Sequence, residues 1–201
     1  MYDIETRLWE EGFERIMGLD EVGRGCLAGP VVAAGVILPP QARIEEIDDS
    51  KKLSAQQRSR IAGAIKQQAL YWTVQSCEPE EIDRRNIYWA SIAAMEKCIG
   101  CKEAEAEYLL VDGKQYPNVM LPGSCLVKGD SRSVSIAAAS VLAKVYRDEL
   151  MHRLHENLPY FGWDTNVGYP TPKHYDGLRK YGITPYHRRS FQLKTDKEYQ
   201  V

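Results

Sequence analysis

The sequence lacks any apolar run of about 18 residues, the length that a membrane-spanning helix requires. It also lacks a basic segment followed by an apolar stretch near its start, which is the pattern of a secretory signal. We therefore expect a soluble, cytoplasmic protein that makes no membrane contact. Low-complexity tracts are missing too, and 44% of the 201 residues are hydrophobic, so the chain can bury one sizeable core.

Cysteines are few and odd in number: Cys26, Cys77, Cys98, Cys101 and Cys125. A chain of this length does not need disulfide bonds to fold, so this usage fits a reducing compartment. Cys98 and Cys101 form one C-x-x-C pair, but there is no second pair to complete a zinc site. We assign no metal there and interpret the pair as small apolar residues at a helix end.

Neither sign of charge is in large excess, because 26 Lys and Arg face 28 Asp and Glu. The resulting net charge of −2 argues against a protein that binds polyanions with its whole surface. The distribution is uneven, since the stretch from Lys173 to Lys194 holds six basic residues and only one acid, Asp176. A basic stretch of this kind is compatible with local phosphate contacts.

The most informative segment present is Asp20-Glu21-Val22-Gly23-Arg24-Gly25, which follows the apolar run Ile16–Leu19. Adjacent carboxylates repel one another and stay ionised together only if water or a cation compensates them. Oxygen ligands of this type suit Mg²⁺ or Mn²⁺, and the two glycines let the backbone approach a ligand closely. Taken alone, the same six residues would also fit a charged turn facing solvent.

Periodicity and turn signals predict an α/β chain. The expected strands are 15–19, 31–38, 71–77, 107–113 and 124–128, and the expected helices are 2–12, the segment after Ser54, 82–99 and 133–156. The first two strands are expected to pair antiparallel, because Gly29-Pro30 between them indicates a tight reversal. Ser54 and Gln57 have the spacing of a capping box.

Two further acids follow predicted strands, namely Asp112 before Gly113 and Asp130 after Gly129. The ends of strands gather at one edge of a parallel or mixed sheet, so Asp112 is expected beside Asp20. Asp130 fits the same cluster, although it would also serve as the cap of the helix that follows. Asp148, on that helix, would either reach the cluster or pair with an arginine.

Aromatic and basic residues alternate near the end of the chain, an arrangement that suits stacking on sugars beside phosphate contacts. For Phe161 and Trp163 we prefer a place in a small C-terminal core. Lys51, in a polar loop before a predicted helix, would either contact phosphate or simply be solvated.

Several motifs in order along the chain resemble bacterial ribonuclease HII over roughly residues 12 to 191. They are Asp20-Glu21-Val22-Gly23-Arg24-Gly25, Asp49-Ser50-Lys51, Val111-Asp112-Gly113-Lys114, Lys128-Gly129-Asp130, Ala143-Lys144-Val145-Tyr146-Arg147-Asp148 and Gly168-Tyr169-Pro170-Thr171. The resemblance implies a ribonuclease H-like fold, with a five-stranded mixed sheet flanked by helices. It also implies one catalytic domain over residues 1–201, with a helical and basic C-terminal extension over about 157–201.

The resemblance also implies roles for individual residues. The four acidic active-site positions of the family fall on Asp20, Glu21, Asp112 and Asp130. The turn that contacts the 2′-hydroxyl falls on Gly23, Arg24 and Gly25, and the tyrosine that stacks on the following deoxyribose falls on Tyr169. Lys51 matches a phosphate contact, and Asp148 matches a recurrent acid near the metals.

The activity implied is hydrolysis of RNA in RNA–DNA hybrids and cleavage 5′ to single ribonucleotides in DNA, with 5′-phosphate and 3′-hydroxyl products. Mg²⁺ or Mn²⁺ is the implied cofactor, with two ions during catalysis. We expect a monomer. The last segment, 192–201, has no recognisable clamp-binding sequence, so it leaves recruitment to replication or repair undecided.

Two other functions remain to be separated by experiment. One is a nucleic-acid-binding module that keeps the fold but cuts nothing, against which the complete set of acids argues. The other is a resolvase or transposase-type nuclease, which would use acids on similar strands but has no need for a ribose-reading turn.

Overall fold

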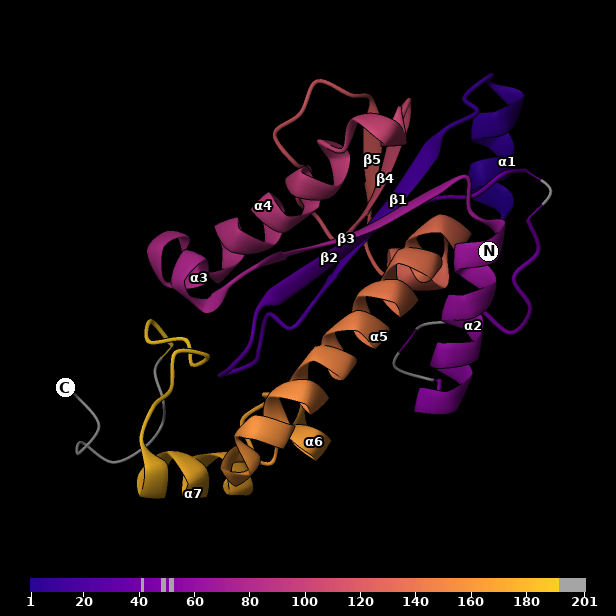
Figure 1. Cartoon of the computed structure of the whole chain (residues 1–201). Helices are drawn as coiled ribbons and strands as arrows, with labels where there is room; N and C mark the ends of the chain where they lie inside the picture. Colours follow the sequence, from indigo (N-terminus) through magenta and orange to yellow (C-terminus); the bar gives the residue numbers. More distant parts are fainter. Residues whose placement is uncertain (41, 48–49, 51–52, 192–201) are drawn as a thin grey trace.

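The computed structural model describes residues 1–40, 42–47, 50 and 53–191, and its centre is one five-stranded sheet (Figure 1). The strands are β1 (Ile16–Val22), β2 (Val31–Ile37), β3 (Tyr71–Cys77), β4 (Tyr108–Asp112) and β5 (Gly123–Leu126). They lie in the order β3-β2-β1-β4-β5. The β1–β2 and β2–β3 pairs are antiparallel, whereas β1–β4 and β4–β5 are parallel. The predicted mixed sheet is confirmed.

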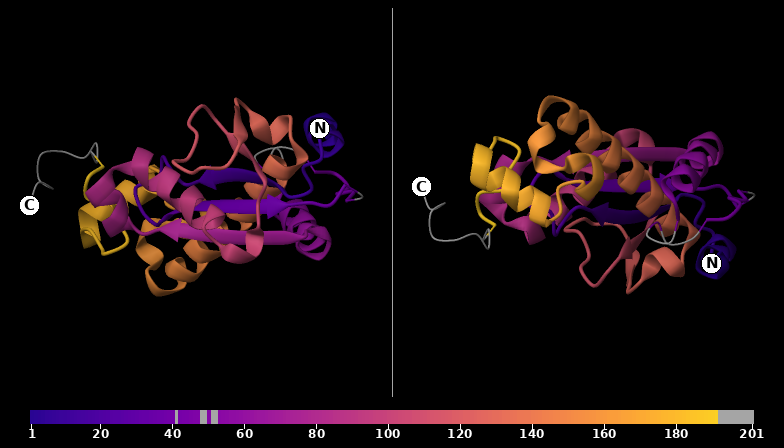
Figure 2. Two further views of the ribbon diagram at one scale, coloured as in Figure 1. Left: turned by 90° about the horizontal axis from the view of Figure 1, so that it is seen from above. Right: turned by 90° about the horizontal axis from the view of Figure 1, so that it is seen from below.

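Helices cover both faces of this sheet, with α4 on one face and α2 and α5 on the other (Figure 1). They are α1 (Asp3–Glu10), α2 (Ala55–Gln68), α3 (Pro79–Arg85), α4 (Ile87–Ile99), α5 (Val134–Asn157), α6 (Trp163–Asn166) and α7 (Pro172–Tyr181). Short 3₁₀ turns span 102–104, 129–131 and 159–161. In the views of Figure 2, α6 and α7 lie at the opposite end of the molecule from α1.

Strand β2 is apolar without alternation because both of its faces are buried. Its even-numbered residues, such as Val32 and Val36, pack toward α2 and α5, and its odd-numbered residues, such as Val31 and Ile37, pack toward α4. A strand buried on both faces reads as a continuous hydrophobic run. The sequence pattern therefore predicted burial correctly.

Helix α5 approaches β1 so closely that only glycine fits at Gly18. A Cβ atom there would lie 2.1 Å from the backbone carbon of Ser135, at the start of α5. Real Cβ atoms do not come this close to a backbone, so any larger residue would push the helix away from the sheet. Because Gly18 is two residues before Asp20, this contact fixes the N-terminal part of α5 close to Asp20.

Two predicted element boundaries were wrong. β1 continues through Val22, so Asp20 and Glu21 lie inside a strand and not after its end. Their pairing with Ala34 and Ala33 of β2 extends the antiparallel ladder past the apolar run. Pairing with a buried neighbouring strand thus outweighed the local preference of acidic residues for turns.

The helix predicted over 82–99 is also wrong as a single element, because it is interrupted at Asn86. This residue has φ of 65°, which ends α3, and its side chain accepts a hydrogen bond from the Trp89 N–H at the start of α4. Asparagine is one of the few residues that adopts positive φ readily and also caps helices.

Helix caps agree with the sequence in α2 and refine it in α5. The Ser54 and Gln57 capping box is present, as predicted. In α5 the cap is Ser133, whose hydroxyl accepts from the Ile136 N–H, whereas Asp130 lies in the preceding 3₁₀ turn. The capping alternative for Asp130 is therefore excluded.

The segments after α5 form a small core of their own with Leu27 and Ala28. Phe161 and Trp163 are almost fully buried in it, as predicted, together with Leu178. Over the described ranges of the chain, none of the helices has the length and apolar character needed to cross a bilayer.

Candidate active site

The parallel pair β1–β4 brings acidic side chains together at one end of the sheet. Leu19 of β1 is in register with Val111 of β4, so Asp20 and Asp112 follow at neighbouring positions. Asp20 is 7% exposed, and Glu21 and Asp112 are half-buried. The predicted proximity of Asp112 to Asp20 is confirmed.

These carboxylates repel one another in a partly dry environment. Burial raises the pKa of Asp20 well above its ordinary value, and the charges of Glu21 and Asp112 raise it further. Burial also raises the pKa of Glu21, although Arg24 opposes that change with its Nη1 3.2 Å from Glu21 Oε1. A single exposed arginine does not neutralise three acids, so the cluster favours binding of a cation.

One hydrogen bond and one neighbouring hydroxyl act on Asp20. The N–H of Glu21 donates to Asp20 Oδ1 at 2.7 Å, and the nearby hydroxyl of Ser140 on α5 lowers the pKa of Asp20. The Ser140 hydroxyl also lies 2.9 Å from that of Ser50, and both serines are buried. Sequence analysis missed Ser140, because a serine on the buried face of a long helix carries no distinguishing pattern.

Asp130 reaches the same region through the turn that carries it. The N–H of Gly129 donates to Asp112 Oδ1 at 2.7 Å, which ties the 129–131 turn directly to an acid of the cluster. Asp130 itself is 7% exposed. The fourth predicted acid therefore lies on a segment anchored to the third.

The donor set suits a hard divalent cation by its chemistry, because carboxylate oxygens on adjacent strands are the ligands that Mg²⁺ and Mn²⁺ prefer. Among the residues that the structure describes, no three Asp, Glu, His or Cys side chains already converge as a metal site. The fit therefore rests on the buried, mutually repelling carboxylates and not on a preformed coordination shell. Such ions usually keep several waters and share ligands with substrate phosphate.

The Gly23-Arg24-Gly25 turn is held rigidly from outside. Gly23 has φ of +92°, and a Cβ atom on it would lie 2.2 Å from Nε of the buried Arg147. Arg188, also fully buried, donates from Nη1 to the carbonyl of Arg24 at 3.0 Å. A turn packed in this way presents its backbone groups in one fixed arrangement.

Tyr169 lies beside this turn, although it is far from Gly25 in the sequence. A Cβ atom on Gly25 would be 3.7 Å from the Tyr169 ring, in ordinary contact. Tyr169 is 40% exposed and lies near the buried Cys26. Burial raises the pKa of Tyr169, so the phenol is neutral. The structure thus joins two of the predicted substrate-contacting segments.

Asp148 takes the second of its two predicted arrangements. Its Oδ1 lies 2.7 Å from Lys144 Nζ, and its Oδ2 lies 3.5 Å from Arg58. The acid therefore faces two cations on α2 and α5. Lys51 lies outside the described residues.

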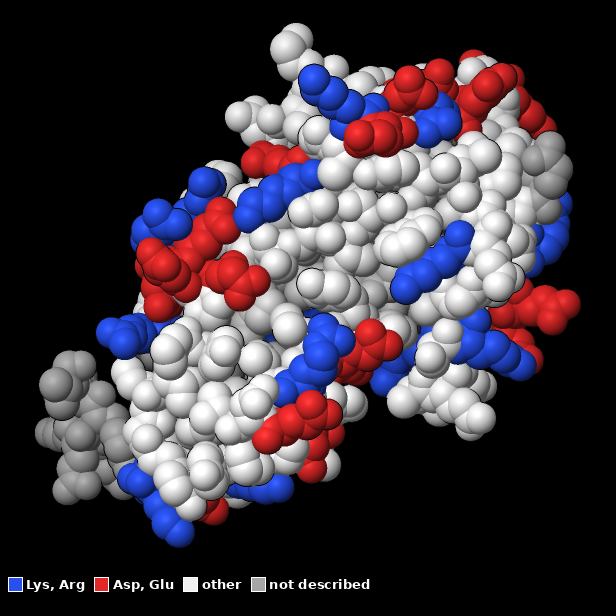
Figure 3. Space-filling view, viewed as in Figure 1, with Lys and Arg blue, Asp and Glu red and all other residues white. Residues whose placement is uncertain are grey.

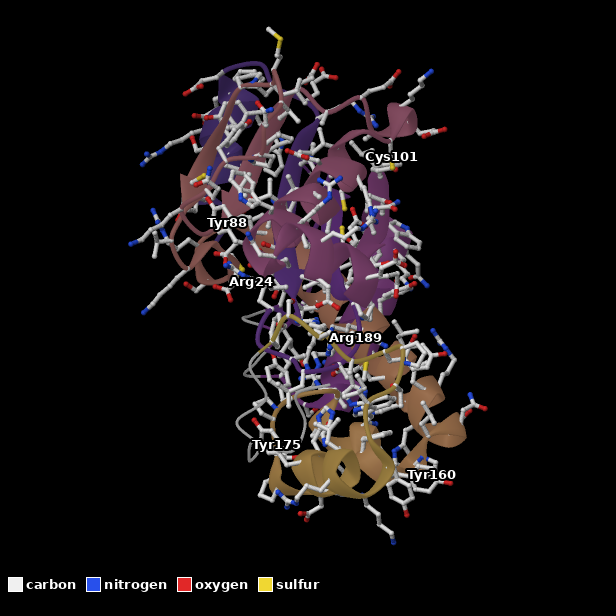
Figure 4. All side chains as sticks on the ribbon, turned by 90° about the vertical axis from the view of Figure 1, so that its left-hand side faces the viewer. Arg24, Tyr88, Cys101, Tyr160, Tyr175 and Arg189 are labelled. Carbon is white, nitrogen blue, oxygen red and sulfur yellow. The ribbon has the colours of Figure 1, made fainter. Side chains whose placement is uncertain are left out.

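A hollow of about 130 Å³ opens next to the acids and contains residues that sequence analysis did not single out. Tyr88 and Ser91 of α4 line it together with Glu21, Arg24 and Asp112. Figure 4 shows Tyr88 and Arg24 on the same side of the molecule, near one another. Tyr88 gave no sequence signal, because a helical tyrosine is ordinarily read as packing.

Charge on the face shown in Figure 3 is mixed, with Lys and Arg scattered among Asp and Glu. This distribution agrees with the near-zero net charge. Of the C-x-x-C pair, Cys98 is buried near the end of α4 with its Sγ 3.5 Å from the Ala33 carbonyl, and Cys101 is half-buried just after the helix.

A family model described as ribonuclease HII matches residues 17–194 of this chain. The chain belongs to the ribonuclease HII family. Ribonuclease HII of Salinibacter ruber is 50% identical over 200 residues, covering 98% of this chain and 100% of that protein. The family resemblance and the ribonuclease H-like fold are confirmed, and membership makes the chain a nuclease, that is, a phosphodiester hydrolase.

Two solved structures of ribonucleases H have the same fold as this chain. RNase HII of Archaeoglobus fulgidus, solved in complex with PCNA, superposes with a TM-score of 0.75 at 27% identity and covers 92% of this chain and 98% of that one. Bst-RNase HIII, solved in complex with Mn²⁺, has a TM-score of 0.64 at 20% identity and covers 90% of this chain and 69% of that one. The second likeness concerns the fold alone.

Proposed function

We propose that this member of the ribonuclease HII family hydrolyses the RNA strand of RNA–DNA hybrids and cuts duplex DNA on the 5′ side of single embedded ribonucleotides, leaving 5′-phosphate and 3′-hydroxyl ends. One observation carries the proposal. The mutually repelling carboxylates of Asp20, Glu21 and Asp112, of which Asp20 is buried and the other two are half-buried, lie next to a rigid Gly-Arg-Gly turn. The first feature supports cleavage of phosphodiesters, and the second supports recognition of ribose.

Asp20, Glu21, Asp112 and Asp130 would hold the divalent ions, either Mg²⁺ or Mn²⁺. The Mn²⁺ complex of Bst-RNase HIII supports divalent-metal use on this fold. When bound, two such ions neutralise the phosphate and lower the pKa of the attacking water. The chain's own contribution is orientation: the Glu21 N–H holds Asp20, while Asp112 accepts a hydrogen bond from Gly129 in the turn that carries Asp130.

Recognition of RNA is assigned to the backbone of Gly23, Arg24 and Gly25. A 2′-hydroxyl is both donor and acceptor, so rigid N–H and C=O groups are suited to detect it. Tyr169 would stack on the deoxyribose after the cut, and Lys51 would contact phosphate. Because the Tyr169 ring lies beside the turn, 3.7 Å from where a Cβ atom on Gly25 would be, the proposed catalytic unit would include the C-terminal extension.

The test is cleavage of a DNA duplex containing one ribonucleotide, beside an all-DNA duplex of the same sequence, in Mg²⁺, in Mn²⁺ and in chelator. We expect metal-dependent cleavage 5′ to the ribonucleotide and an intact control. Cleavage of the all-DNA duplex would favour a resolvase-type nuclease, and binding without cleavage in either metal would favour a binding module.

Variants assign the cleavage to this site. Asp112→Asn should abolish cleavage, whereas Asp176→Asn, which alters an exposed acid paired with Arg179 on α7, should not. Unchanged hydrolysis by Asp112→Asn would show that the proposed metal site is wrong.

A further inference from the structure

A cluster of buried aromatic and histidine side chains lies beneath Tyr169, and the proposed chemistry does not use it. Trp163 and His174 are 0% exposed and His187 is 2% exposed. Phe161 packs against all three rings, with centroids 4.8–6.0 Å away. Buried imidazoles are costly unless their nitrogens are hydrogen-bonded, so each nitrogen needs a partner.

The proton positions in this cluster follow from its backbone partners, beginning at His187. The N–H of Thr184 can only donate, and it lies 3.0 Å from His187 Nδ1. The Thr184 hydroxyl lies 2.9 Å from the same nitrogen. Nδ1 of His187 is therefore an acceptor, and in a neutral ring the proton must be on Nε2.

His174 must then have the opposite tautomer. Its Nε2 lies 3.1 Å from His187 Nε2 and 3.2 Å from the indole N–H of Trp163, and both of these groups donate. Nε2 of His174 is therefore the acceptor, and its proton is on Nδ1. That proton faces the backbone carbonyl of Tyr169, 3.0 Å away.

A directional chain of hydrogen bonds thus runs from Thr184 through His187 and His174 to the Tyr169 carbonyl. A proton added to either ring would place a donor against another donor, so the chain requires both rings to be neutral. Burial lowers the pKa of both histidines, that of His187 to about 3, which agrees with neutral rings.

This chain connects two segments that flank the glycine turn. On one side, the Tyr169 N–H donates to the Asn166 carbonyl at 2.8 Å, and His174 holds the carbonyl of Tyr169. The peptide groups before and after Tyr169 are therefore both fixed. On the other side, the segment of His187 is bound to the residues after the turn, with Gly29 N–H donating to the Tyr186 carbonyl at 2.8 Å. The histidines therefore link the backbone of Tyr169 to the segment that follows the Gly23–Gly25 turn, and they reinforce the direct bond from the Leu27 N–H to the Gly168 carbonyl at 2.8 Å.

We infer that His174 and His187 are positioning residues for substrate cleavage, which hold Tyr169 against the ribose-reading turn through a neutral chain of opposite tautomers. The inference rests on the proposed role of Tyr169 in binding the substrate. Neither histidine touches substrate, because both are buried.

The tautomers can be measured in the unaltered protein, by long-range ¹H–¹⁵N correlation spectra of the histidine rings at pH 7. We expect His174 protonated on Nδ1 and His187 protonated on Nε2. Equal tautomers, or a charged ring at either position, would overturn the chain whatever the outcome of the activity assays.

The positioning role is tested with variants on a duplex that contains one ribonucleotide. His174→Ala should lower kcat/KM about tenfold, because small misplacements of a binding group reduce rate strongly. His174→Asn keeps a donor near the Nδ1 position and should recover most of the loss. The matched control is His152→Asn, an exposed histidine on α5, which should cleave like the parent.

A double-variant cycle separates positioning from general destabilisation. If His174 acts through Tyr169, Tyr169→Ala combined with His174→Ala should cleave no worse than Tyr169→Ala alone. Multiplied losses in proteins that are folded by circular dichroism would overturn the inference and leave the proposed function intact. If His174→Ala does not fold, the same cycle with His187→Gln decides.

A different result identifies failure of the proposed function. If Tyr169→Ala cleaves like the parent, the substrate role of Tyr169 is wrong, and so is the positioning role of the histidines. Failure of metal-dependent cleavage by the parent protein would instead overturn the proposed function as a whole.

Discussion

The acid edge of β1 and β4 and the histidine chain beneath Tyr169 solve the problem of buried polar groups in opposite ways. At the acid edge, like charges lie next to one another, and burial pushes the pKa of Asp20 upward. In the histidine chain, each ring nitrogen has a partner and both rings are neutral. Repulsion destabilises the acid edge until a cation binds, whereas the histidine chain finds all of its hydrogen-bond partners within the protein. The comparison separates a binding site from a scaffold.

The largest expected effect comes from removing charge at the acid edge. Asp20→Asn should lower cleavage at least about a hundredfold, because the substitution removes one of the proposed metal ligands. Without metal, the same change should raise the free energy of unfolding by about 1 kcal/mol, since a neutral amide relieves the repulsion from Glu21 and Asp112. Activity assays and urea titrations in chelator measure the two effects.

Adding Mg²⁺ should raise the melting temperature of the parent protein and have much less effect on Asp20→Asn. If Asp20→Asn is inactive and is also markedly less stable than the parent protein without metal, the proposed repulsion between the carboxylates at this edge is wrong.

The next effect concerns the turn between the two regions. Gly23→Ala should destabilise the protein by about 2–3 kcal/mol, because it combines positive φ with a clash against Arg147. Gly12→Ala is a matched control with φ of +97° and no atom within 4 Å of the added Cβ. It should cost about 1 kcal/mol. Equal costs by chemical denaturation would show that Arg147 does not constrain the turn.

Lowering the pH should reduce the free energy of unfolding through His174 and His187. The folded pKa of His187 is lowered to about 3 and that of His174 is lowered as well, so the unfolded chain binds more protons below its own pKa of about 6.5. Their stabilising contribution is complete above about pH 6.5 and is lost as the pH falls toward the folded values, by about 1.4 kcal/mol per pH unit for each histidine.

Denaturation of metal-free protein at pH 7 and pH 5.5 measures this loss. His187→Gln should lose about 1 kcal/mol less than the parent over this interval. His152→Gln should lose as much as the parent, because His152 is exposed. Asp20 and Glu21 act in the opposite direction, since their raised pKa values favour protonation of the folded state, so the comparison uses matched variants.

The smallest effect is expected at Asp148. Its contacts with Lys144 and Arg58 are those of a partly exposed ion pair, which contributes about 1 kcal/mol or less. Asp148→Asn should therefore change stability by no more than that, and cleavage by less than about threefold. A tenfold loss of cleavage with unchanged substrate affinity would instead support the auxiliary role near the metals that the family resemblance implies.

The sequence predicted those features that depend on short-range patterns. The antiparallel pairing of the first two strands, the α2 capping box and the buried character of β2 all follow from residues close together in the chain. The first two acids were found because the adjacent carboxylates of Asp20 and Glu21 repel one another and need compensation by water or a cation. Placing Asp112 beside them needed only the rule that parallel strands end at the same edge.

What the sequence could not supply depends on contacts across the fold. The extension of β1 through Glu21 depends on pairing with β2, and the interruption at Asn86 depends on a single positive φ value. Ser140 and the histidine chain gave no periodic signal, because their meaning lies in partners on other elements. Long-range hydrogen bonds of this kind are invisible to local patterns.

The buried guanidinium of Arg147 has a further consequence for how this chain can vary. From one position on α5 it donates to the carbonyls of Pro30, Ala28 and Val167, at 3.0, 2.9 and 2.7 Å. A single side chain thus fixes the distance between two loops that are remote in sequence. Insertions or deletions should accumulate outside these loops, because a change of length in either one would detach it from the other.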